Sequence, residues 1–148
     1  MGEHEFLKHL REDHDKQKKL GKQLVEAKDP QERDQLRKQF HDELYPHMIA
    51  EEASMFRLLK DSEDDEARDD GLEGIQEHHV AKIVLRELMD MDTDSEVFKA
   101  KAKVLDELNR HHIDEEEDDV FKHLKKLDDA KLDSLFEQYE KAEEDARK

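Results

Sequence analysis

Two short stretches of this chain place a histidine and a glutamate one helical turn apart. "HMIAE" runs from His47 to Glu51, and "HIDEE" runs from His112 to Glu116. Residues four apart lie on the same side of an α-helix, so each stretch presents an imidazole and a carboxylate together. A buried carboxylate without a partner is strongly disfavoured, and a metal ion would supply the missing positive charge. The spacing therefore predicts metal coordination.

The sequences around these two pairs are also alike. "YPHMIAEEASMF" and "RHHIDEEEDDVF" each carry a phenylalanine nine residues after the histidine, Phe56 and Phe121. One such pair is a weak signal, because most histidines on charged helices face solvent. We interpret four other histidines as surface residues of this kind: His4, His9, His41 and His123. The recurrence of the whole pattern is what favours a shared site.

The register of the second stretch has two solutions. Aligning "DELYPH" with "DELNRH" selects His111 and Glu115, whereas aligning the trailing phenylalanines selects His112 and Glu116. We favour the second solution because His112 follows Leu108 by four residues and so continues an apolar row along the helix. His111 with Glu115 remains the alternative.

Two further histidines lie on the apolar stripes of other segments. His14 follows Leu10 by four residues, and His78 shares its stripe with apolar neighbours better than His79 does, which leaves His79 as the alternative. The predicted ligand set is His14, His47, Glu51, His78, His112 and Glu116. Four imidazoles and two carboxylates suit two borderline divalent ions, with iron ahead of zinc and manganese, and a carboxylate can bridge the pair.

Helices must position these residues, and the apolar periodicity predicts five of them, over residues 3–27, 30–60, 72–91, 95–126 and 129–146. Four long helices joined by short loops predict an all-α, antiparallel up-down-up-down four-helix bundle. The last segment would be a short extra C-terminal helix. We therefore expect one domain over residues 1–148, with the bundle in about 3–126 and the extra helix in about 129–146.

The composition limits the classes of function. The 148 residues include 47% charged and 34% hydrophobic residues, and the formal net charge is −17. This acidity argues against nucleic-acid binding, which needs clustered Lys and Arg. The chain has no cysteine, which excludes disulfides and thiolate metal sites. No apolar run approaches the length of a membrane span. We expect a cytoplasmic protein without membrane or nucleic-acid partners, and favour a monomer.

Four segments resemble the hemerythrin-like HHE cation-binding domains: "LREDHDKQKKL", "ELYPHMIAEEASMF", "EHHVAKIVLREL" and "HHIDEEEDDVF". The resemblance implies a four-helix bundle with a non-haem di-iron centre that is carboxylate-bridged and oxo- or hydroxo-bridged. Carried over by position, one iron would take His14 and His47, and the other would take His78 and His112. Glu51 and Glu116 would bridge the two ions.

One position departs from the oxygen carriers of this family. They have a second histidine four residues after the ligand of the third helix, where this chain has Lys82. The iron held by His78 would then lack a protein nitrogen, and either water or another carboxylate such as Glu115 would complete it. A position left open permits binding of or reaction with O2, peroxide or NO. No separate catalytic base stands out, although Tyr45 could hydrogen bond near the site. Two alternatives remain: an iron-holding or iron-sensing module without catalysis, and a metal-free helical interaction protein.

Overall fold

The computed structural model describes residues 2–148, which contain helices and connecting segments but no strand. The all-helical class predicted from the sequence is confirmed. None of the helices in these residues is both long and apolar enough to span a membrane. The elements are α1 (Glu5–Glu26), α2 (Pro30–Ala53), α3 (Met55–Lys60), α4 (Asp65–Asp90), α5 (Phe98–Glu115), a π-helix η1 (Glu116–Val120), α6 (Phe121–Leu124) and α7 (Asp129–Arg147).

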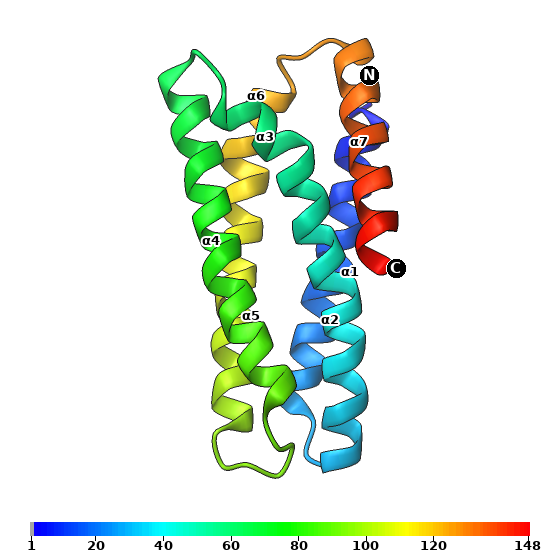
Figure 1. Cartoon of the computed structure of the whole chain (residues 1–148), viewed down its shortest axis with the longest axis vertical. Coiled ribbons are helices and arrows are strands. Elements are labelled where there is room, and N and C mark those ends of the chain that lie inside the picture. Colours follow the sequence, from blue (N-terminus) through cyan, green and yellow to red (C-terminus); the bar gives the residue numbers. More distant parts are fainter. Residues whose placement is uncertain (1) are drawn as a thin grey trace.

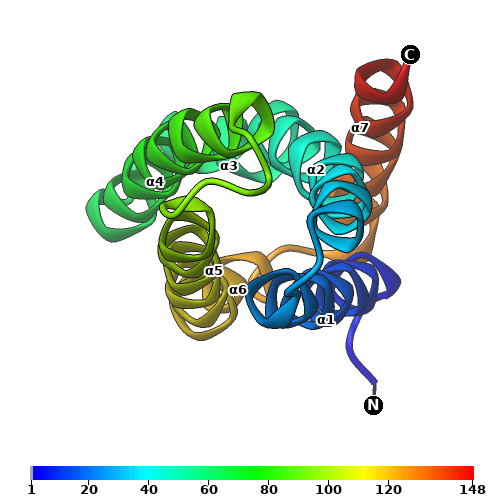
Figure 2. The ribbon, with the colours of Figure 1, turned by 90° about the horizontal axis from the view of Figure 1, so that it is seen from below.

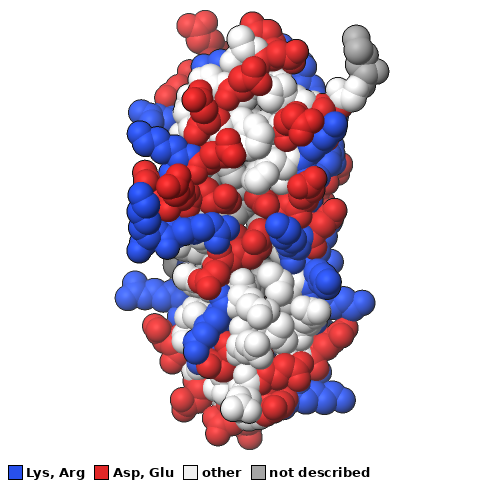
Figure 3. Space-filling model, turned by 90° about the vertical axis from the view of Figure 1, so that its right-hand side faces the viewer, with Lys and Arg blue, Asp and Glu red and all other residues white. Residues whose placement is uncertain are grey.

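The four long helices α1, α2, α4 and α5 surround a common axis (Figure 2). α1 contacts α2 and α5, and α4 contacts the same two helices, so the ring is closed. The α1–α2 and α4–α5 connections lie at one end, and the connections into α4 and α7 lie at the other (Figure 1). α7 packs outside this ring, mainly along α2. The face on the α7 side carries Asp and Glu over most of its length, with Lys and Arg between them and a broad area of other residues in the lower half (Figure 3).

Side chains in the sequence explain where the helices begin. The imidazole of His4 accepts a hydrogen bond from the Phe6 amide at the start of α1. Asp29, Asp64 and Asp128 cap α2, α4 and α7 in the same way, through their carboxylates. Such caps satisfy amides that have no partner within the helix, and a negative charge there also favours the helix dipole.

The apolar core is divided into two clusters along the bundle. One contains Leu10, Phe56 and Phe121, near α3 and α7. The other contains Leu24 and Leu105 at the opposite end. On α1, the buried residues His14 and Gln17 lie between the two clusters. A polar layer therefore crosses the middle of the bundle.

The predicted helix over residues 30–60 is interrupted. Ser54 adopts φ −121° and ψ −95°, which ends α2, and its hydroxyl donates to the Ala50 carbonyl at 2.7 Å. Pro46, where a kink was expected, lies inside α2. The helix predicted to begin at residue 72 is α4. It begins earlier, at Asp65, because the Asp64 carboxylate caps it.

The fourth predicted helix, over residues 95–126, also differs. Ser95 accepts from the Val97 amide in a turn, and α5 begins only at Phe98. The π-helix η1 then interrupts it before α6. π-helices are rare, and those that occur are frequently found at functional sites. Leu108 was expected to face inward but is 37% exposed. The prediction that Leu108 belongs to the buried row of this helix, which was used to choose His112, was therefore wrong.

Candidate metal centre

The six predicted ligands lie together in the polar layer between the two apolar clusters. They come from five elements: His14 from α1, His47 and Glu51 from α2, His78 from α4, His112 from α5 and Glu116 from η1. All six are buried, from 0% exposure for Glu51 to 8% for His112. The buried faces predicted from the helical spacing thus meet at one level of the bundle, with one ligand-bearing face from each long helix.

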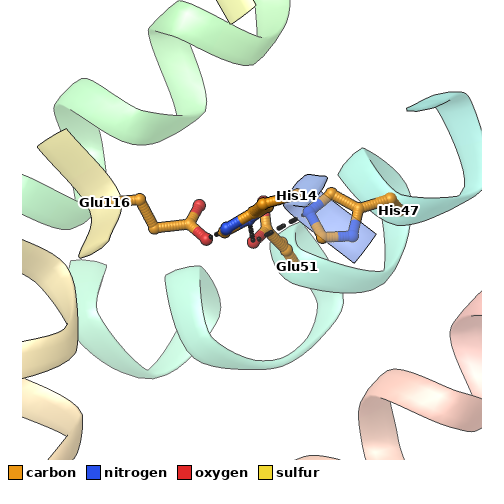
Figure 4. Close-up of side chains that lie close together, drawn as sticks. All are labelled: His14, His47, Glu51 and Glu116. Atoms are coloured by element: carbon orange, nitrogen blue, oxygen red, sulfur yellow. Dashed lines mark ion pairs between the residues drawn. The ribbon is translucent and has the colours of Figure 1, made fainter. Parts of the chain in front are cut away.

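One half of the cluster contains His14 and His47 (Figure 4). Nε2 of His14 lies 2.8 Å from Oε2 of Glu116 and 3.7 Å from Oε2 of Glu51. Nε2 of His47 lies 3.1 Å from that same Glu51 oxygen. One atom from each of these four side chains therefore faces a common space.

The other half contains His78 and His112 and uses the remaining carboxylate oxygens. Nε2 of His78 lies 3.1 Å from Oε1 of Glu51, and Nε2 of His112 lies 3.2 Å from Oε1 of Glu116. The two Nε2 atoms are 3.1 Å apart. Glu51 and Glu116 thus offer one oxygen to each half, which is the arrangement that two ions with shared carboxylates require.

The outer nitrogen of each imidazole has a carboxylate partner of its own. The pairs are His14 Nδ1 with Glu117 at 2.6 Å, His47 Nδ1 with Asp13 at 3.2 Å, His78 Nδ1 with Glu52 at 3.0 Å and His112 Nδ1 with Glu77 at 2.8 Å. Such partners keep a proton on Nδ1 and leave Nε2 free toward a metal, and they are typical of metal-bound histidines. All four imidazoles are therefore oriented for coordination.

The hydrogen bonding of the two central glutamates tests whether cations fit here. All four oxygens of Glu51 and Glu116 are buried and accept no hydrogen bond of good geometry from any described residue, despite their short contacts with imidazole nitrogens. A buried carboxylate left in this state is costly. Nitrogens and oxygens that face a common space without bonding to each other suit cations between them, so the residues fit a two-metal site.

The electrostatics of the cluster agree with this reading. Burial lowers the pKa of His47, but the charge of Glu51 and the bond to Asp13 outweigh it and raise that pKa to about 9. Burial also lowers the pKa of His14 and of His112, but Glu116 outweighs burial and raises both pKa values well above the usual value. Burial raises the pKa of Glu51, but the surrounding imidazoles hold it well below its usual range. The carboxylates that raise the pKa of these imidazoles would equally favour a bound cation, and metal binding would compete with protons for Nε2.

Sequence reasoning missed the tyrosine that reaches this cluster. Tyr139 on α7 is fully buried, and its hydroxyl donates to Oδ2 of Asp13 at 2.8 Å and lies 2.6 Å from Nδ1 of His47. Tyr45, the tyrosine suggested by proximity in sequence, is 36% exposed and stacks on His41. Tyr139 does lie on the apolar stripe of its helix, but nothing local indicates which surface that helix covers.

Lys82 does not reach the cluster. Its Nζ lies 2.9 Å from Oε1 of Glu52, the carboxylate that partners Nδ1 of His78. At the position where the oxygen carriers would have a further histidine, this chain therefore has an ion pair with an outer carboxylate.

The remaining histidines lie outside the cluster. The side chain of His111 is 68% exposed and pairs with Glu115 at 3.0 Å, and His79 is also exposed. The structure thus brings His112 and His78 into the cluster and leaves their neighbours out. The surface assignment of His123 was wrong, because it is 7% exposed and its Nε2 lies 2.7 Å from a carboxylate oxygen of Asp70.

Comparisons with known proteins agree with the geometry. The family model described as hemerythrin HHE cation binding domain matches residues 5–124. Comparisons with curated proteins and with solved structures gave no match. The matched region contains all six buried ligand candidates, and α7 lies beyond it. The chain belongs to the hemerythrin HHE cation-binding domain family.

Proposed function

We propose that the six clustered side chains bind two iron ions. His14 and His47 would hold one ion, His78 and His112 the other, and Glu51 and Glu116 would bridge them, with an oxo or hydroxo group completing the bridge. The observation that carries this proposal is the division of each glutamate, with one oxygen toward each histidine pair. An antiparallel up-down-up-down bundle of the four long helices is the architecture that we infer for this site.

The centre is proposed to bind or react with a small ligand, namely O2, peroxide or NO. Each ion would receive four protein atoms, two from imidazoles and two from shared carboxylates. Iron in such sites takes further ligands, so open positions remain. When bound, the iron pair supplies redox and Lewis-acid chemistry toward that ligand. Position 82 holds a lysine, which pairs with Glu52, and so offers no further imidazole. The lack of that imidazole favours reactivity over reversible oxygen carriage.

The chain's own residues have separate tasks in this proposal. The outer carboxylates, such as Asp13 and Glu77, hold protons on the Nδ1 atoms. The apolar clusters on either side of the polar layer limit the access of water along the axis of the bundle. We also propose that the protein acts as a cytoplasmic monomer without nucleic-acid or membrane partners, which its net charge of −17 supports.

Metal analysis tests the proposal directly. Purified protein incubated anaerobically with Fe(II) and then desalted should retain about two equivalents of iron, since the two groups of four ligands imply two sites. Less than about one equivalent would contradict a two-iron site. Optical spectra of the loaded protein in air, and then with azide, peroxide or NO, should change on addition of each ligand that binds. Bands that bleach reversibly when oxygen is removed would instead favour an oxygen carrier.

A second candidate is an iron-holding or iron-sensing module without catalysis. Its support is the polar layer that divides the core into two clusters, because an ion there would connect helices where apolar packing is interrupted. Circular dichroism of the chelated protein decides this. Loss of helicity and of melting temperature would favour the module, and an unchanged melt would argue against it.

A further inference from the structure

A small cavity lies between α4 and the α5–η1 segment, directly against the ligand cluster. Its volume is about 90 Å³, and His112 and Glu116 form part of its lining. The remaining wall contains five carboxylates and two small or apolar residues, namely Asp70, Glu73, Glu77, Glu115, Asp119, Gly74 and Val120. No lysine or arginine of residues 2–148 lines the cavity, so its wall carries negative charge from the mouth to the ligand cluster.

The carboxylates of this cavity differ in how they are paired. Asp70 contacts His123, Glu77 contacts His112, and Glu115 contacts His111. Glu73 and Asp119 are exposed. Neither is in an ion pair among the described residues, so their charges face the solvent at the mouth.

The buried end of the cavity contains a carboxylate whose oxygens lack a hydrogen-bond partner among the described residues. Glu116 is 1% exposed, and neither of its oxygens accepts a hydrogen bond from a described residue. A route lined by negative charge thus ends at an unsatisfied buried carboxylate and at Nε2 of His112, which lies 3.2 Å from it. A cation is the ligand that would suit both the negatively charged wall of the cavity and the Glu116 and His112 atoms at its buried end.

The other half of the cluster is more enclosed. His14 is 1% exposed and lies between Glu117, whose second oxygen accepts from Arg11, and the ring of Phe121. His47 is 2% exposed and is covered by Tyr139 of α7. His78 is as buried as His47, at 2%, so the two metal positions differ in access through His112, which is 8% exposed and lines the cavity.

We infer that the acidic cavity is the route by which divalent cations reach the cluster and leave it, and that the ion held by His78 and His112 is the exchangeable one. The inference rests on the proposed two-metal function. Carboxylates along a narrow opening raise the local concentration of cations and accelerate their association, and added salt screens this effect. The ion held by His14 and His47 exchanges slowly because it must pass the other position or wait for the bundle to open.

Loading kinetics test the route. Metal-free protein, with its helicity verified by circular dichroism, is mixed with Co(II) in a stopped-flow instrument, and the d–d absorbance is followed. The double variant Glu73→Gln/Asp119→Asn should load about three- to tenfold more slowly at low ionic strength and about equally at high salt. Its final stoichiometry should equal that of the unmodified protein.

The matched control removes the same charge elsewhere. Glu96→Gln/Glu107→Gln changes two exposed carboxylates that do not line the cavity. It should load at nearly the rate of the unmodified protein. Equal slowing by both double variants would mean that only net charge matters, and an unchanged rate in the cavity variant would overturn the route. If the unmodified protein takes up no metal, the proposed function fails instead.

Exchange in the loaded protein tests the second half of the inference. Protein loaded with Co(II) and challenged with excess Zn(II) should lose one equivalent quickly and one slowly. His78→Ala should leave one slow equivalent, whereas His14→Ala should leave one fast equivalent. The reverse assignment, or two equivalents that exchange at one rate in the unmodified protein, would overturn it.

Discussion

The hydroxyl of Tyr139 lies 2.6 Å from Nδ1 of His47 and donates to Oδ2 of Asp13, which itself lies 3.2 Å from that nitrogen. This contact connects α7, which lies beyond the family-matched residues, with a candidate ligand on α2. Because Tyr139 is fully buried, the hydroxyl cannot find water as another partner. The C-terminal helix therefore takes part in the orientation of the His47 imidazole.

Replacing Tyr139 by phenylalanine should weaken both the fold and the site. Asp13 loses a buried donor, which costs roughly 1–3 kcal/mol of unfolding free energy, measured by urea denaturation. Looser support of His47 should lower the affinity for one Co(II) ion by about tenfold, measured by titration. The control Tyr45→Phe alters an exposed, stacked tyrosine and should change neither quantity. Equal effects of the two variants would contradict a specific role for Tyr139.

The two adjacent histidines of α5 should differ sharply in metal binding. His112→Ala removes a buried imidazole that contacts Glu116, so the protein should retain at most about one equivalent of iron. His111→Ala removes a side chain that is 68% exposed and should retain about two equivalents. Iron quantification after desalting distinguishes them. The opposite result would mean that the metal binds on the other face of α5.

The metal-free protein should lose stability as the pH rises from about 6.5 to about 9. The folded pKa of His47 is raised to about 9, so its contribution is fully present below the unfolded pKa and is lost as the pH passes the folded value. This window corresponds to about 3 kcal/mol at most. Glu51 acts in the opposite direction, because its pKa is depressed and its stabilisation disappears only in acid.

Metal should reverse the alkaline part of this profile. A coordinated imidazole is neutral at Nε2, so the stabilisation by bound metal should grow as protons leave between the same two pH values. Urea denaturation of metal-free and loaded protein at a series of pH values measures both curves. A metal-free protein whose stability rises over this range would contradict the pairing of His47 with Glu51.

The outer partners of His78 should contribute unequally. Glu52 contacts Nδ1 of His78 directly, so Glu52→Gln should lower metal affinity by about tenfold or more. Lys82 contacts only Glu52, and Lys82→Gln should have a smaller effect because the carboxylate that faces the imidazole remains. Competition titrations with a chromophoric chelator measure both. A larger effect at Lys82 would indicate that this lysine acts on the site by a different path.

Gly74 permits a close helix contact beside the cluster. A Cβ at this position would overlap the ring of Phe56, which packs edge-on against His78 with ring centroids 5.2 Å apart. Gly74→Ala should lower stability by about 1–3 kcal/mol through this overlap, only partly offset by about 1 kcal/mol of better helix propensity. Thermal melts measure the change. Gly2→Ala, whose Cβ meets nothing closer than 3.7 Å, is the control.

Much of the candidate site could be predicted from the sequence because helical spacing is a local property. His47 and Glu51 are one turn apart in any α-helix, and the apolar stripes of α1 and α4 indicated which sides of His14 and His78 face inward. Four of the six buried positions, His14, His47, Glu51 and His78, follow from this reasoning without knowledge of any long-range contact. Glu116 was also selected, although the π-turn that contains it was not foreseen.

The choice of His112 shows where local reasoning ended. The structure places His112 in the cluster, yet one reason for choosing it failed, because Leu108 is exposed and the buried row contains Leu105 and Asn109 instead. Adjacent histidines on a charged helix have nearly equivalent neighbours in sequence. Only the packing of α5 against α1 and α4 decides which of them is buried.

The sequence by itself therefore determined the helical class, the candidate residues for a metal site, with His111 and His112 both open, and the departure at Lys82. The tertiary structure decided how they are supported and reached: Tyr139 covers His47, carboxylates from three helices and η1 hold the outer nitrogens, and an acidic cavity opens beside His112. The physical reason is distance along the chain. Periodicity records which side of one helix is buried, whereas contacts between residues far apart in sequence depend on how separate helices pack, which no local pattern records.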